Sequence, residues 1–325
     1  MNSSIREAVG RLLYIIPDFP SQAQIEVTNR CNLACAMCPR DHFDLPKEDM
    51  PFETFKKIVG RLDGITLLTL TGWGEPLMHP HIFEMINYCK ERGYKVKLTT
   101  NGTLLTSDVR QRVISSGLDE ITISLESVNK ASEVGHSNLN VLPHVKDLVK
   151  EYRTAVPSVT LQATLHKGKG QDIYDVIGFG KEAGIQRINL GRLDIRLNED
   201  LERPSAQEEI SILREADQLG RELGIRVDSI QYALFDGVER TAYRILKSTL
   251  HRFGKYCLRL YDYIYVNQKA EVTTCCGMPG YGLGNILEKG LGEIWKSKEF
   301  QYFREHHNRI CGRCDLWRIN YTEKK

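Results

Sequence analysis

Three cysteines stand close together near the start of the chain, in the segment IEVTNRCNLACAMCPR. Cys31, Cys35 and Cys38 are spaced C-x3-C-x2-C. In a cytosolic protein, closely spaced cysteines indicate metal ligation or redox chemistry rather than disulfides. Thiolates are the usual ligands of iron–sulfur clusters. Because three thiolates leave one iron of a four-iron cluster without a protein ligand, this spacing predicts a metal centre that can bind a substrate directly.

A structural zinc site is the alternative interpretation of the same three cysteines. Structural zinc takes four closed ligands, so His42 would have to complete the set. The protein would then be a non-catalytic zinc or iron–sulfur scaffold. The missing fourth cysteine favours the open cluster, because a purely structural site should not lack a ligand.

A second group of cysteines gathers in the last quarter of the chain. Its members are Cys257, Cys275, Cys276, Cys311 and Cys314. Four thiolates satisfy either a closed iron–sulfur cluster or structural zinc, so their spacing leaves both open. The remaining cysteine, Cys89, sits in the helical pattern HIFEMINYCKERG and is predicted to be a buried apolar residue.

Short β-rich runs alternate with helical stretches from residue 21 to about residue 230. The runs cover residues 24–28, 64–72, 94–102, 120–127, 159–165, 187–193 and 225–230. Several helical stretches end in glycine just before the next run, as at a helix C-cap followed by a tight loop. This alternation predicts parallel strands with helical crossovers, and hence a full or partial (β/α) barrel. The three early cysteines follow the first run, at the face where such barrels carry their active sites.

The pattern changes after residue 230, and the chain divides into four predicted parts. These are an N-terminal helical arm (1–20), the α/β barrel (21–230), a linker helix (231–253) and a small cysteine-rich α+β domain (254–325). In the last part, LRLYDYIYV and EVTTC flank NQKA as a β-hairpin, and a helix precedes CGRC. Because this part has few apolar residues for its size, we expect it to need a metal to fold.

Composition and charge narrow the class of protein. The 325 residues are 41% hydrophobic and 26% charged, with a net charge of +2. Basic residues are spread along the chain, which argues against a nucleic-acid-binding surface. No apolar run reaches the roughly 20 residues of a membrane helix, and the N-terminus lacks the pattern of a secretory signal. We therefore expect a cytoplasmic protein without nucleic-acid or membrane partners.

The C-x3-C-x2-C motif after the first strand resembles that of the radical S-adenosylmethionine (SAM) superfamily, and the resemblance covers nearly the whole chain. It implies a partial (β/α)6 TIM-like barrel in which the open iron of a [4Fe–4S] cluster binds SAM. One electron then cleaves SAM to a 5′-deoxyadenosyl radical, which abstracts hydrogen from the substrate. An electron donor such as flavodoxin or ferredoxin is expected. Many members carry an aromatic residue before the third cysteine; Met37 here also packs well beside a cluster.

The segment LTGWGEP resembles the GGEP motif of the same superfamily. Gly72, Gly74 and Glu75 are in place, and Trp73 is inserted between the glycines. The resemblance implies that the glycines let the backbone approach SAM and that the carboxylate of Glu75 pairs with the SAM ammonium. A simple strand-ending turn is the alternative.

Polar residues at the ends of the later strands complete the expected SAM site. They are Asn101, Ser124, Gln162, Asn189 and Arg192. By resemblance, Asn101 and Ser124 lie near the ribose, and the backbone of the segment INLGR holds the adenine. Glu126 and His166 also follow strands in this region. For each residue the alternative is a polar side chain that is satisfied by loop backbone.

The late cysteines resemble the auxiliary-cluster extension of radical SAM enzymes, called SPASM or, in its shorter form, twitch. The resemblance implies one auxiliary [4Fe–4S] cluster held by Cys257, Cys275, Cys311 and Cys314. Family hairpins usually have glycine five residues before the second ligand. Ala270 occupies that place here, which favours Cys275 as the ligand and Cys276 as the spare.

These interpretations predict a radical SAM oxidoreductase. We expect it to dehydrogenate a small molecule such as a sugar or cyclitol alcohol, with the auxiliary cluster accepting the second electron. The alternative is a maturase that cross-links or epimerises residues of a short peptide. Such maturases often carry a winged-helix domain for a leader peptide, and the short N-terminal segment favours the small molecule.

Overall fold

The computed structural model describes residues 16–43, 46–129, 140–152, 157–194, 201–229, 257, 259–312 and 314. Most of the predicted N-terminal arm and the whole predicted linker helix (231–253) lie outside these residues. The boundaries predicted on either side of the linker therefore stay predictions.

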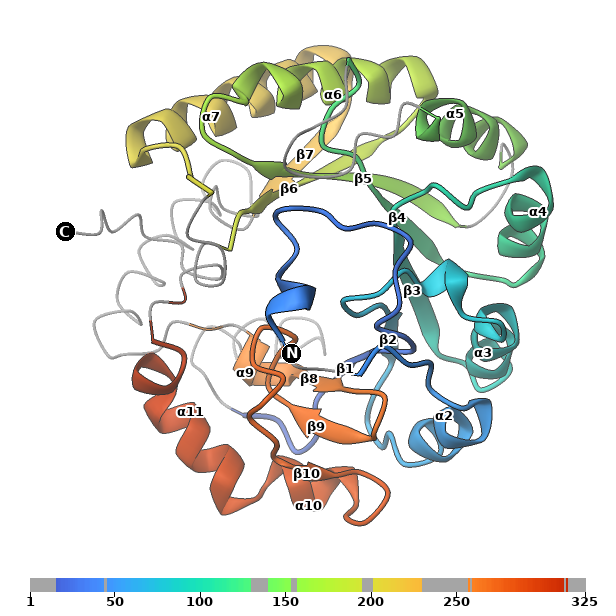
Figure 1. The fold of residues 1–325 in the computed structure, drawn as a ribbon, viewed down its shortest axis with the longest axis vertical. Helices are drawn as coiled ribbons and strands as arrows, with labels where there is room; N and C mark the ends of the chain where they lie inside the picture. The colour runs from blue at the N-terminus through green and yellow to red at the C-terminus, as the bar shows by residue number, and fades with distance from the viewer. Residues whose placement is uncertain are drawn as a thin grey trace, which may run out of the picture.

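The described strands form one sheet of ten, in the order β10-β9-β8-β1-β2-β3-β4-β5-β6-β7. Their bounds are β1 Gln22–Ile25, β2 Leu67–Leu70, β3 Lys95–Thr100, β4 Glu120–Ser124, β5 Ser158–Leu165, β6 Arg187–Arg192, β7 Arg226–Ser229, β8 Tyr263–Val266, β9 Glu271–Thr273 and β10 Gly284–Asn285. Strands β1 to β7 pair in parallel with their sequence neighbours. The sheet curves into an open barrel (Figure 1), which confirms the predicted α/β fold.

Helices connect the successive parallel strands and lie on the outer side of the curved sheet (Figure 1). They are α2 Phe52–Val59, α3 Ile82–Lys90, α4 Ser107–Ser115, α5 Val141–Glu151, α6 Gly170–Ala183 and α7 Ala206–Leu223. Each turns apolar side chains toward the sheet, and Cys89 on α3 is fully buried, as predicted. Helices α6 and α7 end at Gly184 and Gly224, whose φ angles of 79° and 71° confirm the glycine caps.

The predicted hairpin of the cysteine-rich part forms, but it does not make a separate sheet. After α9 (Arg259–Asp262), strand β8 pairs in parallel with β1, and β9 pairs antiparallel with β8. The turn of the hairpin places Ala270 at a φ of 64°, a conformation that glycine adopts without strain. Helices α10 (Leu291–Trp295) and α11 (Lys298–Ile310) follow. The cysteine-rich part thus extends the edge of the barrel sheet.

Of the helices described, none combines the length and the apolar character that crossing a membrane requires.

Candidate active site

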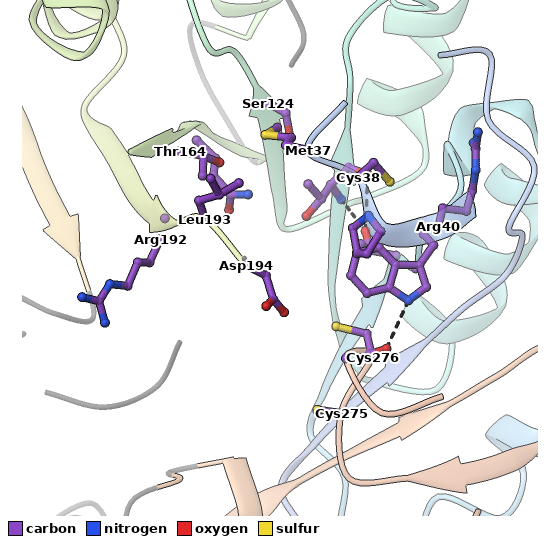
Figure 2. A pocket seen from close by; sticks show the side chains of 18 of the residues that line it. Met37, Cys38, Arg40, Ser124, Thr164, Arg192, Leu193, Asp194, Cys275 and Cys276 are labelled. Atoms are coloured by element: carbon purple, nitrogen blue, oxygen red, sulfur yellow. Dashed lines mark hydrogen bonds between the residues drawn. The ribbon is translucent and has the colours of Figure 1, made fainter. Parts of the chain in front are cut away.

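A cavity of about 700 Å³ opens at the C-terminal ends of the parallel strands. Its walls come from the loop after β1, the ends of β2 to β7, and the loop after β9. All predicted ligand residues line it, namely Cys31, Cys35, Cys38, Gly72, Gly74, Glu75, Asn101, Ser124, Gln162, Asn189, Arg192, Cys257, Cys275, Cys311 and Cys314. The two groups of cysteines therefore share one cavity, as Figure 2 shows for Cys38 and Cys275.

The three early thiols lie close enough to influence one another. The pKa of Cys35 is raised to about 12, first by burial and then by the thiols of Cys38 and Cys31. The backbone N–H of Cys38 donates to the carbonyl oxygen of Cys35 at 3.0 Å, which fixes the turn between them. Three crowded thiolates need positive charge between them, and a bound metal centre deprotonates its thiols outright. An iron–sulfur cluster therefore fits this donor set.

The zinc alternative is less well supported by the same geometry. His42, its required fourth ligand, is exposed at the end of the short 3-10 helix Pro39–His42 and is not among the cavity residues. Within the described ranges, no three Cys, His, Asp or Glu side chains converge on one ion-sized position. A four-iron cluster is larger than one ion and holds its thiolates farther apart.

Gly72 and Gly74 are required by contacts within the protein itself. A Cβ on Gly72 would lie 2.2 Å from the Glu26 side chain, and a Cβ on Gly74 would lie 2.5 Å from the carbonyl oxygens of Thr28 and Arg30. The predicted approach of their backbone to SAM stays a prediction; the structure shows that the segment after β1 occupies the space that side chains would need. Any contact with SAM then falls on the backbone of these residues.

Glu75 is buried and joins the ends of β2 and β3. Its Oε1 accepts hydrogen bonds from Thr100 Oγ1 at 2.7 Å and from the backbone N–H of Leu77 at 3.0 Å. Its Oε2 accepts one from the backbone N–H of Asn101 at 2.7 Å. Burial raises the pKa of Glu75 to about 7 despite these bonds. A nearby cation favours the charged form, so this carboxyl suits the predicted pairing with an ammonium group.

Asn101 connects β3 to the loop of the first cysteines. Its Nδ2 donates to Asn32 Oδ1 at 2.9 Å and lies 3.9 Å from Cys31 Sγ. Its Oδ1 accepts a hydrogen bond from the backbone N–H of Thr103 at 2.9 Å. The side chain that we predicted near the SAM ribose thus also orients the residues around Cys31.

Arg192 differs from the other strand-end residues in its direction. Its Nη2 lies 2.8 Å from Glu209 Oε2 on α7, and both side chains are buried. Figure 2 shows the guanidinium of Arg192 turned away from Cys275 and Cys276. This ion pair braces β6 against α7, so the predicted contact of Arg192 with SAM rests on its backbone.

Glu126 and His166 form a buried pair at the ends of β4 and β5. Glu126 Oε2 accepts a hydrogen bond from the backbone N–H of Thr164 at 2.7 Å and lies 3.9 Å from His166 Nε2. Burial raises the pKa of Glu126 to about 8 and lowers the pKa of His166. Burial therefore favours the neutral form of both groups behind the cavity wall that Thr164 forms.

A partly buried cation, Arg259, accompanies the late cysteines. The guanidinium carbon of Arg259 lies 4.3 Å from the centre of the Tyr263 ring. Burial and the thiols of Cys276 and Cys257 raise the pKa of Cys275, and the charge of Arg259 partly offsets this increase. The hydroxyl of Tyr263 donates to Gln24 Oε1 at 2.6 Å, which ties this region to β1. A positive charge beside several thiolates suits a cluster site, because the cluster and its ligands together are anionic.

The sequence analysis assigned no role to several residues in or beside the site, among them Arg259, Trp73 and Glu26. Trp73 lines the cavity, and its indole Nε1 donates to the carbonyl oxygen of Cys276 at 3.1 Å. Glu26, fully buried on the segment after β1, accepts a hydrogen bond from the backbone N–H of Trp73 at 2.7 Å. The position of Trp73 between two motif glycines could have indicated its role in the site. No feature of the sequence around Glu26 indicated its role.

Comparison with known proteins identifies two family regions in the chain. A family model for the radical SAM superfamily matches residues 25–179, and a model for the SPASM iron–sulfur cluster-binding domain matches residues 257–315. The chain is 26% identical over 309 residues to the tungsten-containing aldehyde ferredoxin oxidoreductase cofactor-modifying protein of Pyrococcus furiosus, covering 86% of this chain and 82% of that protein. It is 24% identical over 315 residues to the AdoMet-dependent heme synthase of Methanosarcina barkeri, covering 90% of this chain and 88% of that protein.

Solved structures share the fold at low sequence identity. Streptococcus suis SuiB bound to SAM superposes with a TM-score of 0.73 at 16% identity, covering 97% of this chain and 75% of that chain. The anSMEcpe structure with bound AdoMet superposes with a TM-score of 0.65 at 15% identity, covering 92% of this chain and 84% of that chain.

Fold, cysteine spacing and family models together define a radical SAM enzyme. The chain belongs to the radical SAM superfamily and carries a SPASM domain at its C-terminal end. Its cofactors are accordingly SAM, a [4Fe–4S] cluster that binds SAM, and auxiliary iron–sulfur.

Proposed function

We propose that this enzyme dehydrogenates a small organic molecule held between its two cysteine groups. The observation that carries the proposal is that Cys31, Cys35 and Cys38 line the same cavity as the late cysteines. When bound, SAM and the first cluster supply a 5′-deoxyadenosyl radical, and an auxiliary cluster supplies an acceptor for one electron. For an alcohol, loss of a hydrogen atom, an electron and a proton leaves a carbonyl group.

Different residues of the chain bind the two clusters and the separate parts of SAM. We assign Cys31, Cys35 and Cys38 to the first cluster and Cys257, Cys275, Cys311 and Cys314 to one auxiliary cluster. Glu75 holds the ammonium of SAM, and the backbone at Gly72 and Gly74 shapes that end of its site. Asn101, Ser124 and Gln162 hold the ribose, and the β6 segment with Asn189 and Arg192 holds the adenine.

The size of the cavity supports a small substrate. Its volume of about 700 Å³ falls within the roughly 300–1,000 Å³ usual for small-molecule sites, and SAM must share it. The first two curated relatives are by name a cofactor-modifying protein and a heme synthase, which supports a small or compact substrate.

A peptide-modifying maturase is the second candidate. A structure of SuiB is described as bound to its precursor peptide SuiA, and this chain superposes on it with a TM-score of 0.73. In that case one residue of the peptide would enter the cavity and the rest would lie outside it.

Deuterium transfer tests the proposal and separates the two candidates. The protein, purified without oxygen and loaded with iron and sulfide, is given dithionite, SAM and a deuterated candidate, either a small alcohol or a peptide. We expect about 8 iron atoms per chain if both sites hold four-iron clusters, and deuterium in 5′-deoxyadenosine from a small alcohol. Label from peptides alone would favour the maturase. A colourless, zinc-loaded protein that leaves SAM intact would favour a non-catalytic scaffold.

A further inference from the structure

The loop after β2 and the loop after β9 meet at one side chain. We propose that Trp73 couples SAM binding to the auxiliary-cluster loop through its hydrogen bond to Cys276. The bond joins the indole Nε1 to the carbonyl oxygen of Cys276 at 3.1 Å (Figure 2). This inference rests on the proposed function, because it takes the first loop as a SAM contact and Cys275 as a cluster ligand.

The backbone around Trp73 is fastened firmly to β1 and its loop. The N–H of Trp73 donates to Glu26 Oε1 at 2.7 Å, and the N–H of Glu75 donates to the carbonyl oxygen of Arg30 at 2.8 Å. Gly74 lies against the carbonyl oxygens of this same loop, with no space for a side chain. The base of the indole is therefore a fixed point on the SAM side of the cavity.

The indole itself spans the cavity wall between the two loops. Its ring lies 5.4 Å from the ring of Phe43, with the planes tilted by 49°. Because Trp73 lines the cavity that SAM and the substrate share, ligands there will contact the same side chain that holds Cys276.

The loop after β9 receives this bond next to a proposed cluster ligand. The carbonyl oxygen of Cys275 accepts hydrogen bonds from Thr273 Oγ1 and from the backbone N–H of Met278, both at 3.1 Å. Thr273 is the last residue of β9 and Met278 lies in the loop itself, whereas the carbonyl oxygen of Cys276 is held from the loop after β2. Contact of SAM with the indole ring is thereby passed, through Nε1, to the segment that carries Cys275.

Hydrogen exchange on the cluster-loaded protein tests the coupling, with SAM as the probe. In the wild type, saturating SAM should slow amide exchange in residues 274–281 by about fivefold, the effect of one net hydrogen bond. It should also change the EPR spectrum of the reduced auxiliary cluster. Trp73→Phe should lose both effects, measured at SAM concentrations that saturate the variant. Trp295→Phe, which removes a bond of 2.8 Å from Nε1 to the carbonyl oxygen of Pro17, is the matched control and should keep both.

A second pair of variants guards against misfolding of Trp73→Phe. Trp73→Gln places an N–H three bonds from Cβ, as tryptophan does, and should keep the SAM effect. Trp73→Met has a similar length without a donor and should lose it. A SAM effect that persists in Trp73→Phe or Trp73→Met, or one that is missing from a wild type that binds SAM, would overturn the coupling alone. A wild type that binds no SAM would overturn the proposed function and the coupling together.

Discussion

The carboxylate of Glu75 at the end of β2 accepts a hydrogen bond of 2.7 Å from the backbone N–H of Asn101 at the end of β3. The bond holds together two of the strand ends that face the first cysteines. Asn101 Nδ2 in turn lies 3.9 Å from Cys31 Sγ. The arrangement around Cys31 therefore depends, through Asn101, on Glu75, which is 44 positions further along the chain.

Replacing Glu75 with glutamine should weaken SAM binding. Both oxygens of Glu75 accept hydrogen bonds, so the NH₂ group of a glutamine would face a donor, either Thr100 Oγ1 or a backbone N–H. A buried donor left without an acceptor costs about 1–3 kcal/mol. We expect the SAM dissociation constant to rise about tenfold or more in anaerobic equilibrium dialysis. Glu53→Gln, whose side chain is 74% exposed on α2, is the control and should change nothing. Equal affinity of Glu75→Gln and wild type would contradict a role for this carboxylate.

Alanine at the two glycines of the GWGEP motif should destabilise the fold to different degrees. At Gly74 the added Cβ meets backbone oxygens at 2.5 Å that have little freedom to move, so we expect a loss of about 3 kcal/mol in the free energy of unfolding. At Gly72 the obstacle is the side chain of Glu26, which can shift, so the loss should be smaller.

Gly178 offers the matched control in urea unfolding. It lies inside α6, and nothing lies within 4 Å of an added Cβ. Because alanine is the better helix former, Gly178→Ala should stabilise the protein by about 1 kcal/mol. If Gly74→Ala were as stable as Gly178→Ala, the tight packing of the motif against the loop after β1 would be wrong.

Serine variants should distinguish the two adjacent late cysteines. After burial, the pKa of Cys275 is raised by Cys276, Cys257 and Cys314, whereas Cys276 responds to Arg259 and Glu26. We therefore expect Cys275→Ser to lower the iron content from about 8 to about 4 atoms per chain, and Cys276→Ser to keep it. Iron analysis with EPR of the reduced protein measures both. The reverse pattern would make Cys276 the ligand.

The buried carboxyl of Glu126 should make stability depend on pH. Burial raises its pKa from 4.5 to about 8, so between these values the folded chain holds a proton that the unfolded chain has released. Stability therefore falls as pH rises through this range. The lowered pKa of His166 acts in the opposite sense, but only below 6.5.

Urea unfolding of the cluster-free chain at pH 6.5 and pH 8 measures this effect. Deprotonation of Glu126 should lower the free energy of unfolding of the wild type by about 2 kcal/mol between these two pH values. The decrease in Glu126→Gln should be smaller by about the same 2 kcal/mol. Identical changes in wild type and variant would show that Glu126 titrates at an ordinary pKa in the folded protein.

Local sequence patterns were sufficient for the barrel and for most of the candidate site. Strand ends of a parallel barrel meet at one face, so Ser124, Gln162 and Asn189 line the cavity simply because they end their strands. The pairing of β8 with β1 was beyond such patterns, because it joins segments about 240 positions apart with no local signal. The bond from Trp73 to Cys276 depends on that pairing, which brings the late loop beside β2.

The reasons for individual residues were also harder to predict than their positions. Gly72 and Gly74 were expected to let the backbone approach SAM, which stays a prediction, and the structure adds that Glu26 and the loop after β1 leave no room for a side chain at either position. The segment of Arg192 was expected to hold the adenine through its backbone, which stays a prediction, and the structure adds that the Arg192 side chain pairs with Glu209. Sequence marks where a polar or small residue stands at a strand end, but only the packing shows which neighbour requires it.

The most direct test of the account is the amount of 5′-deoxyadenosine that the cluster-loaded protein forms from SAM with dithionite. Cys35→Ala should bring it down to the level without protein, because its thiol is needed to hold the cluster that binds SAM. Cys89→Ala, which removes a buried thiol on α3 outside the cavity, should keep it near the wild-type level. Wild-type yields from Cys35→Ala would contradict the central claim that the three early thiolates hold the reactive cluster.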